Sequence, residues 1–282
     1  MRPDYDWEQF IRLSLEEDVR NGDHSALSCI PAVADGHARL NIKQEGIIAG
    51  IELAGMITKQ FDPSLQFQPL VQDGDRVQKG QIGFELRGRA RSILTTERLI
   101  LNCLQRMSGV ATLTAQFVDA LKGSPTQILD TRKTTPLFRA VEKWAVCIGG
   151  GHNHRFGLFD MIMIKDNHID YAGGIRQAIQ KANAYLRVHQ LSLKIEIETR
   201  NLDELREVLS IGAVQRIMLD NYTPDDIRKA VQLINHKYET EISGGVTLDN
   251  IGQYADCGAD YISVGAITHS YRSLDMSLKA IR

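Results

Sequence analysis

From about residue 127 onward, short apolar runs alternate with stretches whose apolar residues recur at helical spacing. The runs predict strands at Gln127–Leu129, Met161–Ile164, Leu193–Ile197, Arg216–Leu219, Thr240–Ile242 and Tyr261–Val264. Between them, the spacing predicts helices at Asp203–Leu209, Pro224–Ile234 and Leu248–Cys257, with Asn201, Thr223 and Thr247 as N-caps. This order is typical of the parallel βα units of an α/β barrel, and with six such units it stays open whether a full barrel of eight forms.

Residues before about 110 follow a different pattern. Helical spacing predicts helices at Trp7–Val19 and Ile51–Phe61, a strand-like run covers 37–46, and the Asp73-Gly74 pair predicts a hairpin within 71–86. A long helix over Thr95–Leu121, in which Ser108-Gly109 marks a kink or close packing, joins the two parts.

We therefore expect a smaller α+β sandwich domain at 1–110 and a barrel-like catalytic domain at 111–269. A C-terminal helix at about 270–282 is expected to pack with the first domain.

Composition narrows the class of protein. A chain of 282 residues with 43% hydrophobic content is long enough for a sizeable core and two domains. The net charge of −2, with basic and acidic residues interspersed, argues against a nucleic-acid or membrane surface. We expect a cytoplasmic protein, because the opening residues lack the pattern of a secretory signal and no apolar run is long enough to span a bilayer. The four cysteines form no C-x-x-C pair, which predicts reduced thiols.

Chemically reactive side chains follow the predicted strands. The carboxyl ends of parallel strands in a barrel open on one shared mouth, so residues directly after the strands are expected to meet there. This set contains several cations and two acids: Thr131, Arg132, Lys133, Lys165, Glu198, Asp220, Ser243, Gly244, Gly245, Val264, Gly265 and Ala266.

Two of these loops are rich in glycine. Ser243-Gly244-Gly245 and Gly265-Ala266 follow consecutive strands, where backbone N–H groups and a following helix favour a phosphate group. The alternative is a pair of tight turns without a ligand.

The cations suit a ligand that carries several negative charges. Arg132 and Arg155 present planar forks for carboxylates, whereas Lys133 and Lys165 are compact charges suited to pyrophosphate oxygens. Any single one of them is also compatible with a solvated surface charge.

Glu198 and Asp220 end successive strands and are expected to face the same mouth. They suit Mg²⁺ coordination, or the stabilisation of a cationic sugar, and Glu196 points the same way as Glu198. Ion pairs with the nearby cations are the structural alternative.

Three histidines lie near this set. His152 and His154 have the spacing of two metal ligands on one strand face, with His168 as a third. We favour substrate hydrogen bonding, because the neighbouring Arg155 and Lys165 would repel a divalent ion.

Several runs of this sequence together resemble quinolinate phosphoribosyltransferase, also called nicotinate-nucleotide pyrophosphorylase (carboxylating). They are LDTRKTTP (129–136), EKWAVCIGGGHNHRFGLFDMIMIKDNH (142–168), IEIET (195–199), IMLDN (217–221), ISGG (242–245), ISVGA (262–266), EEDVRNGDHS (16–25), QEGIIAG (44–50) and TERLILNCLQRMSGVAT (96–112). The similarity covers essentially the whole chain. One local difference is Leu137, where the pattern has a glycine after the proline.

The resemblance implies transfer of a phosphoribosyl group from 5-phosphoribosyl pyrophosphate to quinolinate. Carbon dioxide is lost, and nicotinate mononucleotide is made for NAD synthesis. It also implies an incomplete α/β barrel, similar to a TIM barrel, beside the smaller α+β sandwich domain. Mg²⁺ as cofactor and a homodimer as the minimum assembly are implied as well.

The resemblance also assigns residue roles. Arg132, His154 and Arg155 would bind the quinolinate carboxylates, and Lys133 and Lys165 would contact substrate or pyrophosphate. Glu198 and Asp220 would serve Mg²⁺ and the ribose, and Ser243–Gly245 with Gly265 and Ala266 would hold the 5-phosphate. Arg98, which by its spacing alone reads as part of an exposed helix face, would reach the active site of a partner subunit.

Three other functions remain as alternatives. The first is a molybdenum-linked paralogue of the same fold, from which we expect an incomplete pairing of T-R-K-T-T-P with H-N-H-R. The second is a barrel aldolase that uses Lys165 as a Schiff base, and the third is a non-catalytic module that binds phosphorylated ligands.

Overall fold

The computed structural model describes residues 3–281, and the chain divides into two compact units. Unit 1 contains the described residues through Ala115, Pro136–Gly150 and the described residues from Ser270 onward. Unit 2 contains Gln116–Thr135 and Gly151–His269.

Unit 2 is built on a six-stranded sheet in the order β6-β11-β10-β9-β8-β7. Its strands are β6 (Gln127–Leu129), β7 (Ile162–Ile164), β8 (Ile195–Thr199), β9 (Arg216–Asp220), β10 (Glu239–Ser243) and β11 (Tyr261–Ser263). All neighbouring strands are parallel, and β6 and β7 form the two edges. The predicted incomplete α/β barrel is confirmed.

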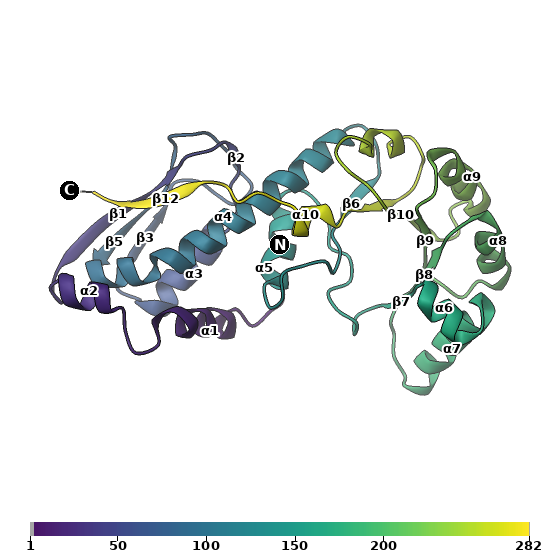
Figure 1. The fold of residues 1–282 in the computed structure, drawn as a ribbon, viewed down its shortest axis with the longest axis horizontal. Helices are drawn as coiled ribbons and strands as arrows, with labels where there is room; N and C mark the ends of the chain where they lie inside the picture. Colours follow the sequence, from purple (N-terminus) through teal and green to yellow (C-terminus); the bar gives the residue numbers. More distant parts are fainter. Residues whose placement is uncertain (1–2, 282) are drawn as a thin grey trace. The chain divides into compact units, whose positions relative to one another are not determined.

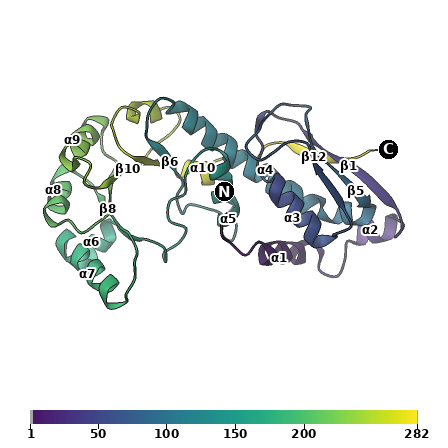
Figure 2. The same ribbon diagram turned by 180° about the vertical axis from the view of Figure 1, so that it is seen from behind.

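The helices of unit 2 are α6 (Asp166–Ala172), α7 (Ile175–Val188), α8 (Leu202–Ile211), α9 (Pro224–Ile234) and the short α10 (Ala266–His269). Figures 1 and 2 show α7, α8 and α9 along the outer side of the curved sheet. The register gives each strand one apolar face, on which Ile197, Ile217 and Ile242 are fully buried. The opposite face of the same strands carries charged residues.

The N-caps predicted for α8 and α9 are confirmed, since Asn201 and Thr223 accept hydrogen bonds from N–H groups of their first turns. The predicted helix at Leu248–Cys257 is wrong. The segment holds only a short 3₁₀ helix, Ile251–Tyr254, whose N-cap is Asn250 and not Thr247. The Asn250 carboxamide accepts the Thr247 N–H instead, and this local turn, followed by Gly252, competes with a regular helix.

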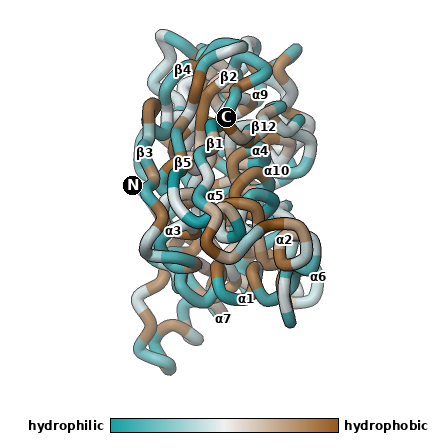
Figure 3. Tube along the Cα trace, turned by 90° about the vertical axis from the view of Figure 1, so that its left-hand side faces the viewer, coloured by the Kyte–Doolittle hydropathy of each residue, from teal (hydrophilic) through white to brown (hydrophobic). Residues whose placement is uncertain are grey.

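Unit 1 contains a four-stranded antiparallel sheet in the order β12-β1-β5-β3 and a two-stranded sheet of β2 and β4. The strands are β1 (Asp35–Ile42), β2 (Gly46–Ile47), β3 (Gln66–Pro69), β4 (Arg76–Val77), β5 (Ile82–Arg89) and β12 (Met276–Ala280). The helices are α1 (Trp7–Val19), α2 (His24–Cys29), α3 (Ile51–Phe61), α4 (Ala90–Ala120, which continues into unit 2) and α5 (Arg139–Ile148). Figure 3, coloured by hydropathy, shows that hydrophobic and hydrophilic positions alternate along β1.

The predicted hairpin within 71–86 is wrong in its pairing. β4 pairs with β2, whereas β5 pairs with β1 and β3. Asp73 was expected to form a turn, but its side chain also caps a helix. Its carboxylate accepts hydrogen bonds from the N–H groups of Gly50 (2.6 Å) and Ile51 (2.8 Å) at the start of α3.

The predicted C-terminal helix is also wrong. Residues Met276–Ala280 form β12, which pairs antiparallel with β1 in unit 1. Met276 and Leu278 are buried and Ser277 and Lys279 are not, which is the period of two expected for a strand covered on one side.

The border between the two units differs from the one expected at residue 110. α5 belongs to unit 1, and its Trp144 packs against Trp7 with ring centroids 4.9 Å apart. Gly149 also lies so close to the backbone of Ala111 that a side chain there would overlap it. Ser108 donates to and accepts from the Ala49 backbone, so the Ser108-Gly109 pair marks close packing.

Within residues 3–281, no helix combines the length and apolar character needed to cross a bilayer.

Candidate active site at the carboxyl edge of the parallel sheet

The residues predicted for the site in unit 2 gather at one edge of its sheet. Because all six strands run in the same direction, their carboxyl ends lie along a single edge. The loops at this edge carry Thr131–Lys133 after β6, Lys165 after β7, Asn221 after β9, Gly244 and Gly245 after β10, and Val264–Ala266 after β11. Glu198, Asp220 and Ser243 stand at or next to the ends of their own strands.

Lys165 and Glu198 form an ion pair across this edge. The Lys165 ammonium lies 2.8 Å from a Glu198 carboxylate oxygen. The Glu198 side chain is 9% exposed and the Lys165 side chain 44% exposed, so the pair is open to solvent from the lysine side. The Lys165 backbone N–H donates to Nδ1 of His168, which fixes the start of α6.

Asp220 and the Ser243-Gly244 loop are linked through Asn221. The Asn221 carboxamide donates to the Asp220 carboxylate at 2.7 Å, and the Asn221 N–H donates to the Ser243 carbonyl at 2.8 Å. Asn221 itself adopts a left-handed backbone conformation (φ +57°). Gly244 (φ +96°) lies so close to the Asn221 side chain that any side chain at 244 would overlap it. The loop is therefore held tightly around Asp220.

The loop after β11 contacts the loop after β6. Val264 donates its N–H to the Leu129 carbonyl, and the Thr268 hydroxyl donates to the Lys133 carbonyl at 2.9 Å. A side chain at Gly265 would come within 3.0 Å of the Lys133 stem, so this glycine leaves room for the lysine to extend along the edge.

Arg132 and Arg155 bring two positive charges close together. Burial, followed by the charge of Arg132, lowers the pKa of Arg155. The Arg155 guanidinium donates to the Met161 carbonyl at 3.1 Å, and Arg132 is exposed. Two guanidinium groups held near each other repel, and an anion bound between them would relieve this repulsion.

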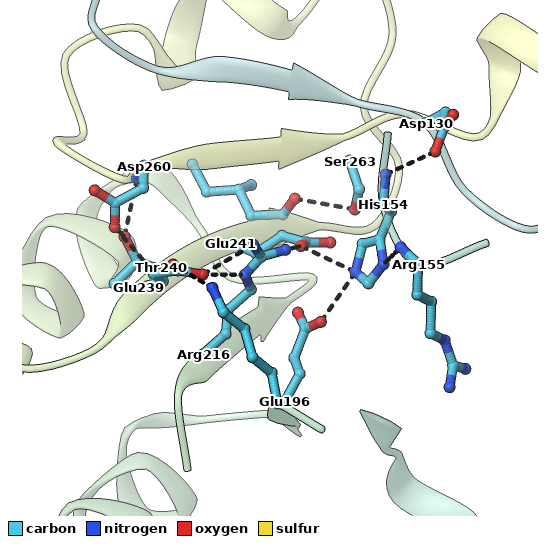
Figure 4. A network of polar contacts seen from close by, with 12 residues as sticks. Asp130, His154, Arg155, Glu196, Arg216, Glu239, Thr240, Glu241, Asp260 and Ser263 are labelled. Carbon is cyan, nitrogen blue, oxygen red and sulfur yellow. Dashed lines mark hydrogen bonds and ion pairs between the residues drawn. The ribbon is translucent and has the colours of Figure 1, made fainter. Parts of the chain in front are cut away.

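His154 lies at the centre of a buried cluster on the polar face of the sheet (Figure 4). Its Nε2 is 2.9 Å from a Glu196 carboxylate oxygen and 3.3 Å from one of Glu241, and its side chain is only 4% exposed. Its Nδ1 accepts the Arg155 backbone N–H at 2.6 Å. The His154 backbone N–H donates to Asp130 at 2.9 Å.

Arg216 completes this cluster. Its guanidinium donates to Glu241 (3.1 Å) and to one oxygen of Glu239 (2.9 and 3.0 Å), and it stacks on the Tyr261 ring at 4.3 Å. Lys194 pairs with the other oxygen of Glu239. Three carboxylates thus face two permanent cations, and one further proton neutralises the set.

That proton resides on the His154–Glu196 pair. Burial and the Glu241 charge raise the pKa of Glu196 to about 7. Burial opposes protonation of His154, but its ion pairs with Glu196 and Glu241 outweigh that effect and raise its pKa to about 9. A doubly protonated ring would turn Nδ1 into a donor facing the Arg155 N–H. We therefore place the extra proton on the Glu196 carboxyl group.

Among residues 3–281, the side chains that could together hold a metal ion are those of His154, Glu196 and Glu241. Each offers one ligand atom, and these atoms lie within 4.8 Å of one another. The positive charge of Arg216 beside Glu241 argues against a cation there. His152 is exposed and pairs by its backbone with Leu129, and His168 is exposed at the start of α6. The three-histidine metal site considered from the sequence is thus not assembled.

Sequence reasoning singled out Glu196 and missed Arg216, Glu239 and Glu241. The signal was present, because charged residues alternate with uncharged ones in IEIE (195–198) and in ETEI (239–242). Strands buried on both faces normally read as continuous apolar runs, so this alternation indicates a polar inner face. Arg98 lies in the unit 1 part of α4 and is exposed.

Comparisons with known proteins agree along the whole chain. Residues 110–279 match the family described as quinolinate phosphoribosyl transferase, C-terminal domain, and residues 23–108 match the N-terminal domain family of the same name. The chain is 47% identical over 292 residues to quinolinate phosphoribosyltransferase (decarboxylating) 2b, mitochondrial, of Nicotiana tabacum, covering 98% of this chain and 83% of the relative. It is 42% identical to the probable nicotinate-nucleotide pyrophosphorylase (carboxylating) of Bacillus subtilis, covering 93% and 89%. The crystal structure of NadC from Streptococcus pyogenes superposes with a TM-score of 0.91 at 38% identity, covering 98% of this chain and 97% of that one.

Proposed function

The chain belongs to the quinolinate phosphoribosyltransferase family, and we infer that it transfers the phosphoribosyl group of 5-phosphoribosyl pyrophosphate to quinolinate. The pyridine nitrogen forms a bond to C1 of the ribose as the bond from C1 to pyrophosphate breaks. The carboxylate next to the ring nitrogen then leaves as carbon dioxide, and its bonding electrons remain on the ring carbon, which takes up a proton. The products are nicotinate mononucleotide, pyrophosphate and carbon dioxide, as in the decarboxylating activity that the relatives' names give.

The observation that carries the residue assignment is that Arg132, in the loop after β6, lies near enough to Arg155 for their charges to interact. Each guanidinium can bind one carboxylate in a bidentate manner, and quinolinate carries two. Burial and, after it, the charge of Arg132 lower the pKa of Arg155, and a bound dicarboxylate would relieve the repulsion between the two arginines. Oriented in this way, the pyridine nitrogen would face the ribose.

Lys133 and Lys165 supply point charges for the departing pyrophosphate. We assign the 5-phosphate to the loops at Ser243–Gly245 and Val264–Ala266, because their glycines allow close approach of backbone N–H groups. No side chain has to act as a nucleophile, since charge placement stabilises the loose, cationic sugar of the transition state.

The acids at this edge fit Mg²⁺. Asp220 is half-buried and has its carboxylate oriented by Asn221, and Glu198 lies on the neighbouring strand. Both are hard oxygen donors of the kind this ion prefers, and it would neutralise pyrophosphate charge. Because Lys165 already pairs with Glu198, we propose Asp220 as the more direct contact.

Arg98 is proposed to serve the site of a second copy of the chain, in a homodimer. Its exposure on α4 is compatible with this role.

The decisive experiment is incubation of the purified protein with quinolinate, 5-phosphoribosyl pyrophosphate and Mg²⁺ while nicotinate mononucleotide and pyrophosphate are followed. Nicotinate replaces quinolinate in the control. We expect turnover with the dicarboxylate only, and a severe loss in Lys165→Ala and Arg132→Ala. Wild-type rates in both variants at saturating substrate would contradict the site assignment.

The alternatives have distinct outcomes in the same assay. Binding of phosphoribosyl pyrophosphate without pyrophosphate release would indicate a binding module, and borohydride trapping of a carbonyl substrate on Lys165 would indicate an aldolase. Turnover that requires another acceptor would indicate the molybdenum-linked paralogue.

A further inference from the structure

The side chain of His154 is occupied on both of its ring nitrogens by the protein itself. Nδ1 accepts the Arg155 N–H, and Nε2 lies against Glu196 and Glu241. In this arrangement the His154 ring acts on a bound anion indirectly, because it holds the backbone N–H of Arg155 and so positions the Arg155 side chain.

Glu196 and Glu241 are themselves held on rigid elements. They stand on β8 and β10, on either side of β9, and both are fully buried. The guanidinium of Arg216, from the strand between them, fixes Glu241 at 3.1 Å, and its stacking on Tyr261 restricts its own movement. The two carboxylates therefore hold the His154 ring in a fixed position.

Arg155, by contrast, lies on a segment without regular structure. The residues between the His152 bridge and β7 form no helix or strand. His154 is where this segment is attached to the sheet, through its backbone bond to Asp130 and through its ring. Figure 4 shows the Arg155 side chain extending away from the cluster, starting directly beside this attachment.

The attachment opposes a force that would otherwise displace Arg155. Arg132 repels the Arg155 guanidinium before any anion binds, and the charges of Glu196 and Asp160 offset this repulsion in part. A guanidinium on a free segment would move away, and the carboxylate it is meant to hold would lose its alignment.

We propose that Glu196 and Glu241 are positioning residues that seat the His154 ring and thereby fix Arg155 for one carboxylate of the acceptor. The proposal rests on the proposed function only for the identity of that acceptor. Neither glutamate has to touch substrate.

Glu241→Gln and Glu196→Leu test the proposal, with Glu239→Gln as the matched control. Glu239 stands on the same strand as Glu241 and binds the same Arg216, but it contacts Arg216 and Lys194, whereas Glu241 also contacts His154. In the two test variants we expect KM for quinolinate to rise about tenfold or more, with KM for phosphoribosyl pyrophosphate within about twofold of wild type. The control should leave both KM values within about twofold.

A general loss of structure would act differently. It would lower the melting temperature and the fraction of active protein and would change both KM values alike. An unchanged quinolinate KM in both test variants, or a parallel change for both substrates, would overturn the proposal.

A second measurement covers the case in which a variant does not fold. In wild-type protein labelled with ¹⁵N-histidine, NMR should show His154 with an unprotonated Nδ1 and a protonated Nε2. A protonated Nδ1 would remove the link to Arg155 and overturn the proposal. This readout needs no turnover, so it separates failure of the proposal from failure of the proposed function, which absence of wild-type activity would reveal.

Discussion

The four-stranded antiparallel sheet and the six-stranded parallel sheet each carry a cluster of charged side chains, and the clusters differ in their access to water. On the antiparallel sheet, Glu85 of β5 is surrounded by His37 and Arg39 of β1 and by Arg87. Their distances to Glu85 are 2.8, 2.8 and 3.0 Å, as short as those in the His154 cluster. The three surrounding side chains are 26% to 56% exposed, so water can replace any one of them.

In the cluster around His154, water cannot take the place of a lost partner. Glu196 and Glu241 are fully buried, and Arg216 is 7% exposed. A charge that loses its partner there remains in a medium of low polarity, whereas Glu85 would simply be hydrated. Ion pairs of similar length therefore differ in how much their loss destabilises the fold. The loss costs more where the pair is buried.

The largest effect is expected for Arg216→Met. The change leaves Glu241 and Glu239 without their shared cation, and we expect it to lower the free energy of unfolding by about 3–5 kcal/mol. Urea denaturation measures this, and Arg39→Met is the control in the exposed cluster. If both variants had the same urea midpoint, the contrast between the clusters would be wrong.

The two clusters should also respond oppositely to pH. Glu196 has a raised pKa of about 7 in the folded protein, so its contribution to stability is complete below its ordinary pKa of 4.5 and is lost as pH rises through about 7. Hydrogen bonds from Arg87, Arg39 and His37 lower the pKa of Glu85 to about 2. The contribution of Glu85 to stability is therefore complete above its ordinary pKa of 4.5 and is lost as pH falls through about 2.

The difference in urea midpoint between wild type and Glu196→Gln, followed from pH 4 to 10, checks this prediction. We expect the transition near 7, and a transition near 9 would instead assign the extra proton to the His154 ring.

A smaller effect is expected at Tyr261, whose ring supports the Arg216 guanidinium. Tyr261→Leu should lower the free energy of unfolding by about 1 kcal/mol, because the attraction between the cation and the ring is lost. Tyr261→Phe keeps the ring and serves as the control. Equal losses in both variants would show that the hydroxyl, and not the ring face, supports Arg216.

The smallest effect is expected for Arg87→Gln. Glu85 keeps Arg39 and His37, and water takes the place of the lost guanidinium. The melting temperature should remain within the error of the measurement. A clear fall would mean that exposure does not protect this cluster.

The strands of unit 2 and two of its helices, α8 and α9, could be predicted from the sequence. Runs such as RIMLD (216–220) and PDDIRKAVQLI (224–234) have a hydrophobic period and end signals that depend only on nearby residues. The positions of Lys165, Glu198 and Asp220 at one edge followed from the same strands. Their mutual arrangement matches the prediction that these side chains share one edge, and their roles in catalysis remain predictions.

Predictions from neighbouring residues were wrong where contacts with residues distant in sequence determine the secondary structure. The 276–280 segment is a strand because β1 offers it an edge, and Arg76–Val77 pairs with Gly46–Ile47 although β5 is nearer in sequence. Leu137 was noted as a departure from the family pattern, and its left-handed backbone (φ +61°) explains why glycine suits that position.

The sequence by itself determined the family, the parallel βα order and the set of polar residues that follow the strands, because each of these is written in short runs of neighbouring residues. Only the tertiary structure decided that Glu196, Glu241 and Arg216 meet at His154 away from water. Three strands and a loop bring them together, and their burial depends on how the sheet curves around them. A carboxylate whose partners are exposed can be hydrated when it loses one of them, whereas a buried carboxylate cannot, and that difference in hydration cannot be read from the residue itself.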